Sequence, residues 1–205
     1  MVVKVTKDNL TDILKKAIGI LNKGGIIAYP TETFYGIGAR FDIENALKRI
    51  YELKKRPEEK PMPLIIGDRK MLLMISVPIN NTVSALMDKF WPGPLTLLLR
   101  AKKELSQYLT AGTANIAVRI PGESIALQLA IMMGFPITAT SANLSGMPPA
   151  EDAETVLKYF GNTIDLIIDG GKTPGGFSST IIDVTGEKIK IVREGAIPIS
   201  ALKDF

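Results

Sequence analysis

The chain has 205 residues, of which 46% are hydrophobic and 22% charged, and this composition is typical of a folded globular protein rather than a disordered chain. Its 25 basic and 21 acidic residues leave a net charge of +4, which indicates either an ordinary mixed surface or a local basic site for phosphates or nucleic acid. Cysteine and histidine are both absent, so disulfides, thiol nucleophiles, imidazole bases and zinc sites built on Cys or His are excluded.

The elements expected from apolar periodicity and turn residues alternate between strand and helix at first, and strands cluster late. In chain order we expect strands at residues 2–6, 26–29, 63–66, 95–100, 116–120, 137–140, 164–169, 180–184 and 188–193, and helices at 9–22, 42–53, 69–75, 81–90, 123–133 and 151–160. This order predicts an α/β layer fold with a mixed parallel and antiparallel sheet. The length predicts a single domain over residues 1–205.

The N-terminal segment carries Lys4, Lys7 and Asp8 where a signal peptide needs an apolar core. The longest apolar stretches, such as residues 71–79, are far shorter than the roughly 18 residues of a membrane-spanning helix. We therefore expect a cytoplasmic protein with no membrane partner.

Two glycine-containing segments resemble nucleotide-binding loops but fail in their spacing. Residues 171–173 read GKT, yet Leu166 stands where a P-loop needs its first glycine. Residues 36–38 read GIG, yet Phe41 stands at the third glycine of the dinucleotide fingerprint. We interpret both segments as turns.

Segment 30–38, PTETFYGIG, follows an apolar strand and alternates hydroxyl groups with bulky side chains. Ligands of open α/β sheets bind beyond the carboxyl ends of strands, so this position favours a binding site. The alternative is a plain turn, for which Phe34 and Tyr35 are poor choices.

Segment 54–61, KKRPEEKP, is either a solvated helix end, where cations complement the helix dipole, or a phosphate site. Its prolines would hold Lys54, Arg56 and Lys60 in a defined array, and such an array suits a polyphosphate.

Segment 137–146, ITATSANLSG, changes from an apolar strand into a run of hydroxyls and an amide. Thr140, Ser141 and Asn143 could cradle an anion or a base edge, or could form an ordinary turn. A second hydroxyl cluster lies at 178–180, and Arg119 and Arg193 each end a predicted strand.

Trp91, within WPGP, is interpreted as a packing residue at a structural corner. The remaining candidates are dominated by Lys, Arg, Ser, Thr and Asn. That profile favours positioning and electrostatic stabilisation of a phosphorus centre over covalent or proton-relay catalysis.

With these segments in view, the chain resembles the YrdC-like threonylcarbamoyl-adenylate synthases, in their short single-domain form. The resemblance extends from about Leu10 to Ala196 and rests on PTETFYGIG (30–38), KKRPEEKPMPL (54–64), FWPGPLTLLL (90–99), AVRIP (117–121), TSANLSG (140–146), SSTIID (178–183) and VREG (192–195). It implies a twisted mixed α/β sheet, flanked by helices, around a basic cavity.

The resemblance also implies a reaction in which L-threonine, bicarbonate (or CO2) and ATP, with Mg2+, give threonylcarbamoyl-AMP and pyrophosphate. A downstream transfer complex then places the threonylcarbamoyl group on adenosine 37 of tRNA, and tRNA itself is expected to bind this chain only weakly.

The family's residues fall on two groups of positions in this chain. The catalytic group is Lys54, Arg56, Ser141 and Asn143, and ATP would be bound by these four together with Lys60, Thr140 and Arg193. The threonine pocket would consist of Thr33, Tyr35, Arg119 and Ser179, with Arg119 as the partner of the substrate carboxylate. No protein ligand set for a metal is expected, because the candidate loops offer few carboxylates.

Two other interpretations stay open. A similar domain occurs inside the much larger hydrogenase-maturation carbamoyltransferases, but the acylphosphatase-like and zinc-binding parts of those proteins have no counterpart in this sequence. An RNA-binding or ribosome-assembly module is compatible with the basic charge, although no aromatic-rich strand of the RNA-recognition type is visible.

Overall fold

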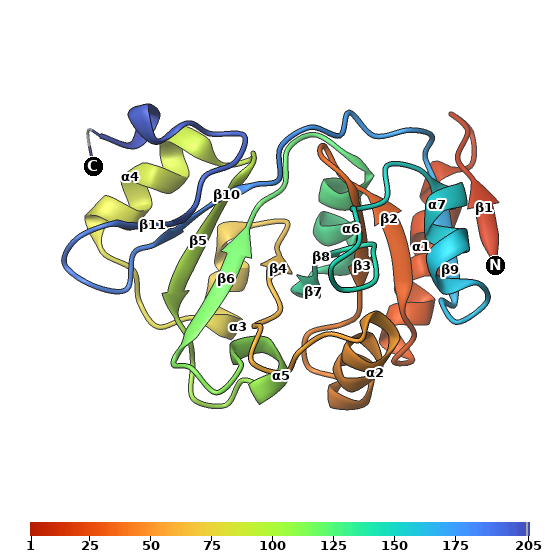
Figure 1. Ribbon diagram of the computed structural model, residues 1–205, viewed down its shortest axis with the longest axis horizontal. Coiled ribbons are helices and arrows are strands. Elements are labelled where there is room, and N and C mark those ends of the chain that lie inside the picture. Colours follow the sequence, from red (N-terminus) through yellow and green to blue (C-terminus); the bar gives the residue numbers. More distant parts are fainter. Residues whose placement is uncertain (204) are drawn as a thin grey trace.

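In the computed structural model, which describes residues 1–203 and 205, the strands form two hydrogen-bonded sheets that lie side by side (Figure 1). The strands are β1 (Val2–Lys4), β2 (Ile27–Pro30), β3 (Tyr35–Gly38), β4 (Leu64–Ile65), β5 (Leu95–Arg100), β6 (Asn115–Arg119), β7 (Ile137–Thr138), β8 (Thr140–Ser141), β9 (Leu166–Asp169), β10 (Thr180–Asp183) and β11 (Lys190–Arg193).

The helices pack around these sheets, and most lie where the sequence predicts them. They are α1 (Leu10–Asn22), α2 (Glu44–Lys54), the 3-10 turn η1 (Arg69–Met71), α3 (Leu72–Ile75), α4 (Asn81–Phe90), α5 (Gln107–Thr110), α6 (Ile125–Met133), α7 (Ala153–Phe160) and η2 (Ile199–Leu202). None of the helices in the described part of the chain combines the length and the apolar character needed to cross a membrane.

The first sheet has the order β1-β9-β2-β3-β8 and the second has the order β11-β10-β5-β6-β4-β7. Each contains parallel pairs, such as β1 with β9 and β10 with β5, and antiparallel pairs, such as β2 with β3 and β5 with β6. The expected mixed α/β fold is confirmed, but the strands form two sheets where a single one was expected.

The division into two sheets arises from one short stretch, residues 137–141. β7 pairs with β4 of the second sheet, and β8 pairs with β3 of the first. Ala139 lies between them and donates its N–H to Pro63 O at 2.8 Å. The stretch predicted as one strand at 137–140 therefore passes from one sheet to the other.

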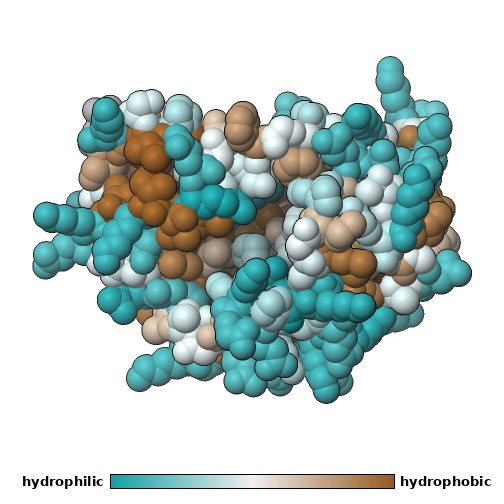
Figure 2. Space-filling model, viewed as in Figure 1, coloured by the Kyte–Doolittle hydropathy of each residue, from teal (hydrophilic) through white to brown (hydrophobic). Residues whose placement is uncertain are grey.

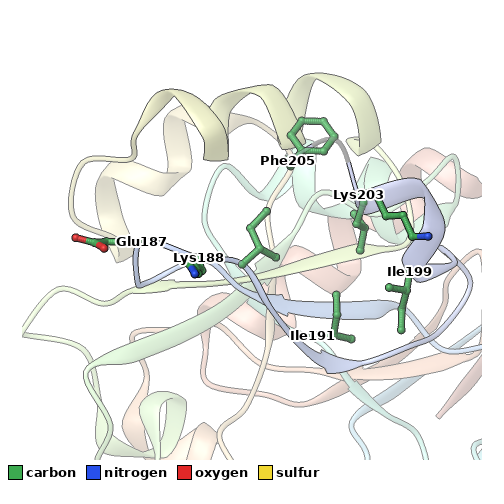
Figure 3. A pocket seen from close by; sticks show the side chains of 8 residues that line it. Glu187, Lys188, Ile191, Ile199, Lys203 and Phe205 are labelled. Carbon is green, nitrogen blue, oxygen red and sulfur yellow. The ribbon is translucent and has the colours of Figure 1, made fainter.

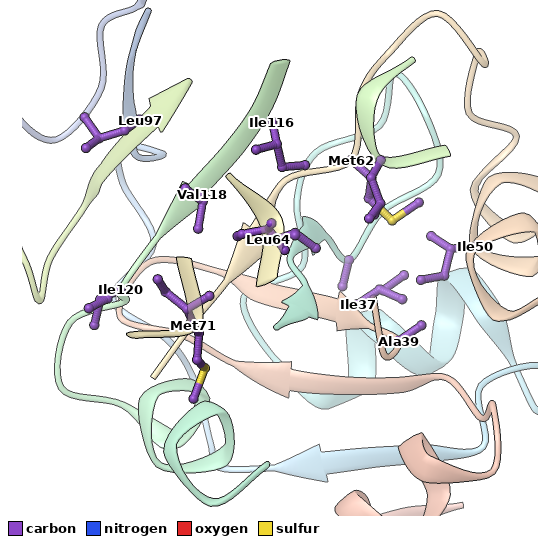
Figure 4. Close-up of a cluster of buried hydrophobic side chains, with 14 of the residues drawn as sticks. Ile37, Ala39, Ile50, Met62, Leu64, Met71, Leu97, Ile116, Val118 and Ile120 are labelled. Carbon is purple, nitrogen blue, oxygen red and sulfur yellow. The ribbon is translucent and has the colours of Figure 1, made fainter. Parts of the chain in front are cut away.

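The main hydrophobic core lies where the two sheets meet α2. Ile37 of the first sheet and Leu64 and Val118 of the second belong to one cluster of buried side chains, as does Ile50 of α2 (Figure 4). Fully burying such a side chain contributes roughly 1.5–3 kcal/mol. A second cluster packs α1 and α6 against the first sheet. Because the main cluster spans both sheets, it fixes their relative position.

The predicted helix at residues 9–22 shows how local sequence produces an element. Ile13, Leu14, Ala17 and Leu21 recur at helical spacing and are all buried. The helix ends before Gly24, whose φ of +77° few other residues adopt. Trp91 is also confirmed as a packing residue, since it is buried and its indole N–H donates to Leu95 O at 2.7 Å.

Strand β3 was not predicted, because segment 30–38 was interpreted as a binding loop and its glycines as turn residues. The glycines are needed because the Tyr29 ring on β2 covers them. A Cβ on Gly38 would lie 2.6 Å from Cε1 of Tyr29, and a Cβ on Gly36 would lie 3.3 Å from Cε2. The short helices α5 and η2 were also not predicted, since four residues are too few to show a period.

Gly67 joins β4 to the helices that follow and lies against the backbone of α6. A Cβ there would come within 2.4 Å of Ile131 N and 2.6 Å of its Cα. We expect Gly67→Ala to lower the free energy of unfolding by roughly 1–3 kcal/mol, because backbone atoms have to move apart. Gly19 lies on the exposed face of α1, where a Cβ would meet no atom within 4 Å outside the helix's own backbone. Gly19→Ala should therefore raise the free energy of unfolding by about 0.5–1 kcal/mol.

Urea denaturation of both variants checks this prediction. Equal stability of Gly67→Ala and the wild-type protein would contradict it, because the backbones of this turn and of α6 could then move apart at no measurable cost.

Candidate active site

A cavity of about 600 Å3 lies between the two sheets and opens in the hollow near the middle of the face in Figure 2. Nine of the eleven predicted site residues line it: Thr33, Tyr35, Arg56, Lys60, Arg119, Thr140, Ser141, Ser179 and Arg193. Lys54 and Asn143 are not among the lining residues. The structure therefore brings together both predicted groups of residues, from segments that are far apart in the sequence.

The convergence follows from the topology. Thr33 follows β2, Arg119 ends β6 and Arg193 ends β11. Ser141 belongs to β8, where the chain crosses between the sheets, and Arg56 lies just beyond α2. The ends of strands from both sheets and the end of α2 therefore meet at one cavity, as expected for ligand sites in α/β folds.

The cavity is positively charged. Arg56, Lys60, Arg119 and Arg193 line it, and none of the described lining residues is Asp or Glu. Burial lowers the pKa of Arg193, and the positive charge of Arg119 lowers it further. These two guanidinium groups therefore act on the same space, and an anion placed there would relieve their repulsion. The expected basic cavity is present.

Lys54 lies behind the cavity wall rather than on it. Its side chain is buried, and Nζ donates to Ser141 O, to Asn143 O at 2.6 Å and to Asn143 Oδ1 at 3.5 Å. The Ser145 N–H donates in turn to Lys54 O at 2.9 Å. Lys54 thus ties the end of α2 to the turn that carries Ser141.

Asn143 is part of the same turn. Its Nδ2 donates to Leu144 O at 2.9 Å and to Met147 O at 2.7 Å, and its Oδ1 accepts from Ser141 Oγ at 2.5 Å. Ser141 therefore lines the cavity, while the amide group of Asn143 stabilises the turn at residues 141–147 through its hydrogen bonds. Direct contact of Lys54 and Asn143 with a nucleotide stays a prediction.

Arg56 is fixed by its own loop. Its Nε donates to Lys60 O at 3.2 Å and its Nη2 to Pro61 O at 2.7 Å, and the guanidinium carbon lies 6.0 Å from the centre of the Tyr51 ring. Burial lowers the pKa of Arg56. The Arg56 side chain is therefore held by the loop, whereas Lys60 is exposed although it also lines the cavity.

Arg119 has an internal partner that the sequence did not reveal. Its Nη1 donates to Oε1 of Glu32, the residue that precedes Thr33. The other carboxylate oxygen, Glu32 Oε2, is buried without a hydrogen-bond partner in the described structure. Glu32 lies in segment 30–38, which was predicted to bind a ligand, but the spacing of nearby residues cannot reveal a partner 87 positions away. Arg119 is thus a lining residue of the cavity whose charge already has a partner in the free protein.

Tyr35 is a lining residue of the cavity, but its hydroxyl group has other partners. The hydroxyl donates to Gly171 O at 2.7 Å and accepts from Gly170 N at 3.2 Å. Burial raises its pKa to about 12, so it stays protonated at neutral pH. Thr33 lies beside Thr31, with 3.1 Å between their hydroxyl oxygens. A hydroxyl contact with a ligand is thus better served by Thr33 than by Tyr35.

A second hollow, of about 330 Å3, lies near the C-terminal end of the chain (Figure 3). Ile191, Ile199 and Phe205 line it together with Lys188 and Lys203. None of the predicted site residues is among its described lining residues, so it is separate from the candidate site.

The surroundings of Lys54 predict a pH effect on stability. Burial and the nearby charge of Arg56 lower its pKa from 10.5 to about 7. Between these values the unfolded chain binds more protons than the folded one, so stability rises with pH over this range and is lost as the pH falls through about 7. We expect the free energy of unfolding of the wild-type protein to rise between pH 6.5 and 9 relative to that of Lys54→Met.

Chemical denaturation at several pH values measures this difference, with Lys48→Met on the exposed face of α2 as the matched control. The same pH slope in the wild type and in Lys54→Met would contradict the prediction.

Comparison with known proteins identifies the family. The family model Sua5_yciO_yrdC, described as telomere recombination, matches residues 19–195. The chain belongs to this family.

Its curated relatives include proteins named threonylcarbamoyl-AMP synthase. That of Pyrococcus abyssi is 39% identical over 190 residues, with 93% of this chain and 56% of the relative covered. That of Bacillus subtilis is 39% identical over 185 residues, with 90% and 54% covered. The chain thus spans about half the length of these two relatives, whereas it covers 100% of the Coxiella burnetii relative, at 33% identity and with 90% of this chain covered.

Among solved structures, Pyrococcus abyssi Sua5 complexed with L-threonine has a TM-score of 0.94 and 36% identity, with 100% of this chain and 60% of that chain covered. The whole described fold therefore has a close structural counterpart within a longer protein.

Proposed function

We propose that this protein is a threonylcarbamoyl-AMP synthase, which converts L-threonine, bicarbonate (or CO2) and ATP into threonylcarbamoyl-AMP and pyrophosphate. The observation that carries the proposal is the single cavity lined by four cations and several hydroxyl groups. It is supported by the likeness to a protein solved with L-threonine and by the names of the relatives.

ATP would be held at the side of the cavity formed by the loop after α2 and by β8. Arg56 and Lys60 would bind the phosphates, with Thr140 and Ser141 as further, uncharged contacts. Lys54 and Asn143 would act mainly by holding the turn that carries Ser141. Arg193 would be a further contact of the nucleotide.

Threonine would be held by Arg119, Thr33 and Ser179, with Tyr35 forming part of the wall. Arg119 is the natural partner of the substrate carboxylate, because it lines the cavity and only its Nη1 has a hydrogen-bond partner among the described contacts, Glu32.

The chemistry needs positioning more than proton relays. The threonine amine forms a carbamate, with release of water if bicarbonate reacts or of a proton if CO2 reacts. One carbamate oxygen then attacks the α-phosphorus in line, and pyrophosphate leaves. In this cavity the cations would neutralise the departing pyrophosphate, and the hydroxyl groups would orient the reacting oxygens. This division of labour is consistent with a chain that contains no histidine or cysteine.

Mg2+ enters the proposal as the usual companion of ATP. The described residues contain no group of three or more acidic or other metal-ligating side chains that could hold a metal, and the cavity lining offers no carboxylate. The residues present do not form a magnesium site of their own, and we assign no step to the ion.

The wider setting is part of the same proposal. The product would pass to a complex that modifies tRNA, tRNA itself would bind weakly, the protein would act in the cytoplasm, and residues 1–205 would form one domain. An RNA-binding module has less support, because the cations converge inside a cavity rather than on an open face.

Purified protein should release pyrophosphate only when ATP, L-threonine and bicarbonate are all present, because the cavity is proposed to assemble all three before the α-phosphorus is attacked. Mass spectrometry should find threonylcarbamoyl-AMP in the same mixture. Pyrophosphate release that is indifferent to threonine would replace this proposal with a simple nucleotide hydrolase.

Arg119→Lys should raise the KM for L-threonine about tenfold while changing the KM for ATP less than twofold. Lysine keeps a positive charge beside Glu32 but loses the planar fork, and a lost hydrogen bond to a charged group is worth roughly 1.5–3 kcal/mol. Steady-state kinetics with each substrate varied in turn give both constants. A defect confined to ATP would show that the threonine pocket is assigned wrongly.

A further inference from the structure

The Ser179 hydroxyl group on the cavity wall accepts two hydrogen bonds. Thr96 Oγ1, on β5, donates to Ser179 Oγ at 2.9 Å, and Arg193 Nη2 donates to the same oxygen at 3.3 Å. A serine hydroxyl has two acceptor positions and a single proton. Both acceptor positions are therefore occupied.

The direction of these two bonds follows from chemistry and burial. Arginine can only donate. Thr96 is 3% exposed, and in the described structure Ser179 is the partner of its hydroxyl group. Thr96 is itself a lining residue of the cavity, and its hydroxyl group donates to Ser179 Oγ, so the Ser179 proton does not serve this bond. The Ser179 proton is left without an acceptor in the described protein, and Ser179 lines the cavity.

The positive charges near Ser179 favour a negatively charged acceptor for its hydroxyl proton. Arg193 also donates to Ser179 O, from Nη2 at 2.7 Å and from Nε at 3.3 Å, so backbone and side chain are both fixed. The charge of Arg119 reaches Arg193, as the lowered pKa of Arg193 records. An oxygen bound by Ser179 would lie in the field of two guanidinium groups.

We propose that Thr96 is a positioning residue that makes Ser179 a donor-only group for a carboxylate oxygen of the amino-acid substrate. This inference rests on the proposed function. Of the polar groups of threonine, the carboxylate only accepts hydrogen bonds, the ammonium only donates and the hydroxyl does both. A donor-only Ser179 beside two cations therefore matches the carboxylate and excludes the ammonium from this position.

The test compares Thr96→Val with Thr96→Ser. Valine has the shape of threonine without the donor, so the Ser179 proton is free to turn away from the cavity. We expect Thr96→Val to raise the KM and the calorimetric Kd for L-threonine fivefold to tenfold, with kcat changed less than twofold. Thr96→Ser keeps the hydroxyl group and should stay within twofold of the wild type in all three quantities.

Thr110→Val is the matched control, because Thr110 is a buried threonine outside the cavity lining, and its threonine KM should not change. A double-mutant cycle tests whether Thr96 acts through Ser179. In the presence of Ser179→Ala, adding Thr96→Val should cause no further loss of threonine affinity.

Additive losses in that cycle, or a threonine Kd of Thr96→Val equal to that of the wild type, would overturn the inference. Failure of the proposed function would appear differently, as wild-type protein that neither binds L-threonine nor needs it to release pyrophosphate.

Discussion

The stretch Ile137–Ser141 is the constraint on which both the fold and the site depend. Its first two residues pair with β4 of the second sheet and its last two with β3 of the first. The Ala139 N–H donates to Pro63 O, and the Thr138 N–H donates to Ala39 O at 2.9 Å. Five residues thus anchor two sheets to each other, and the cavity opens where the sheets part. Any change in this crossing would move Thr140 and Ser141 relative to the arginines of the second sheet.

A buried charge then connects this crossing to the loop of cations. Removing an ammonium group from water is costly, and the oxygens of Ser141 and Asn143 offset only part of that cost, since the pKa of Lys54 stays lowered. Because Lys54 is the last residue of α2, its hydrogen bonds also fix the position of the loop that starts there and carries Arg56. Segments 54–61 and 137–146 look like independent binding motifs in the sequence, but Lys54 joins them. Lys54, which was predicted to bind phosphate, therefore supports the segments that carry Arg56 and Ser141.

The sequence predicted the elements with clear periodicity, such as α1, and most of the residues that it singled out after apolar strands line the cavity. It failed where the decisive contact is long-range. Glu32 meets Arg119 across 87 residues and Thr96 meets Ser179 across 83, and neither pair has a local signature. Strand β3 was missed for a related reason: its glycines exist to receive Tyr29, which is a contact between strands and not a property of the strand itself.

The distribution of donors and acceptors explains why this site can work without histidine. Four cations and several residues with hydroxyl groups line the cavity, and Glu32, whose carboxylate pairs with Arg119, is not among the described lining residues. A triphosphate, a bicarbonate and an amino-acid carboxylate all present acceptor oxygens. In the proposed reaction, the same surplus of donors would hold all three and then receive the charge of the leaving pyrophosphate. Glu32 keeps this surplus from becoming an uncompensated buried charge in the free protein, since its carboxylate pairs with Arg119 before any ligand enters the cavity.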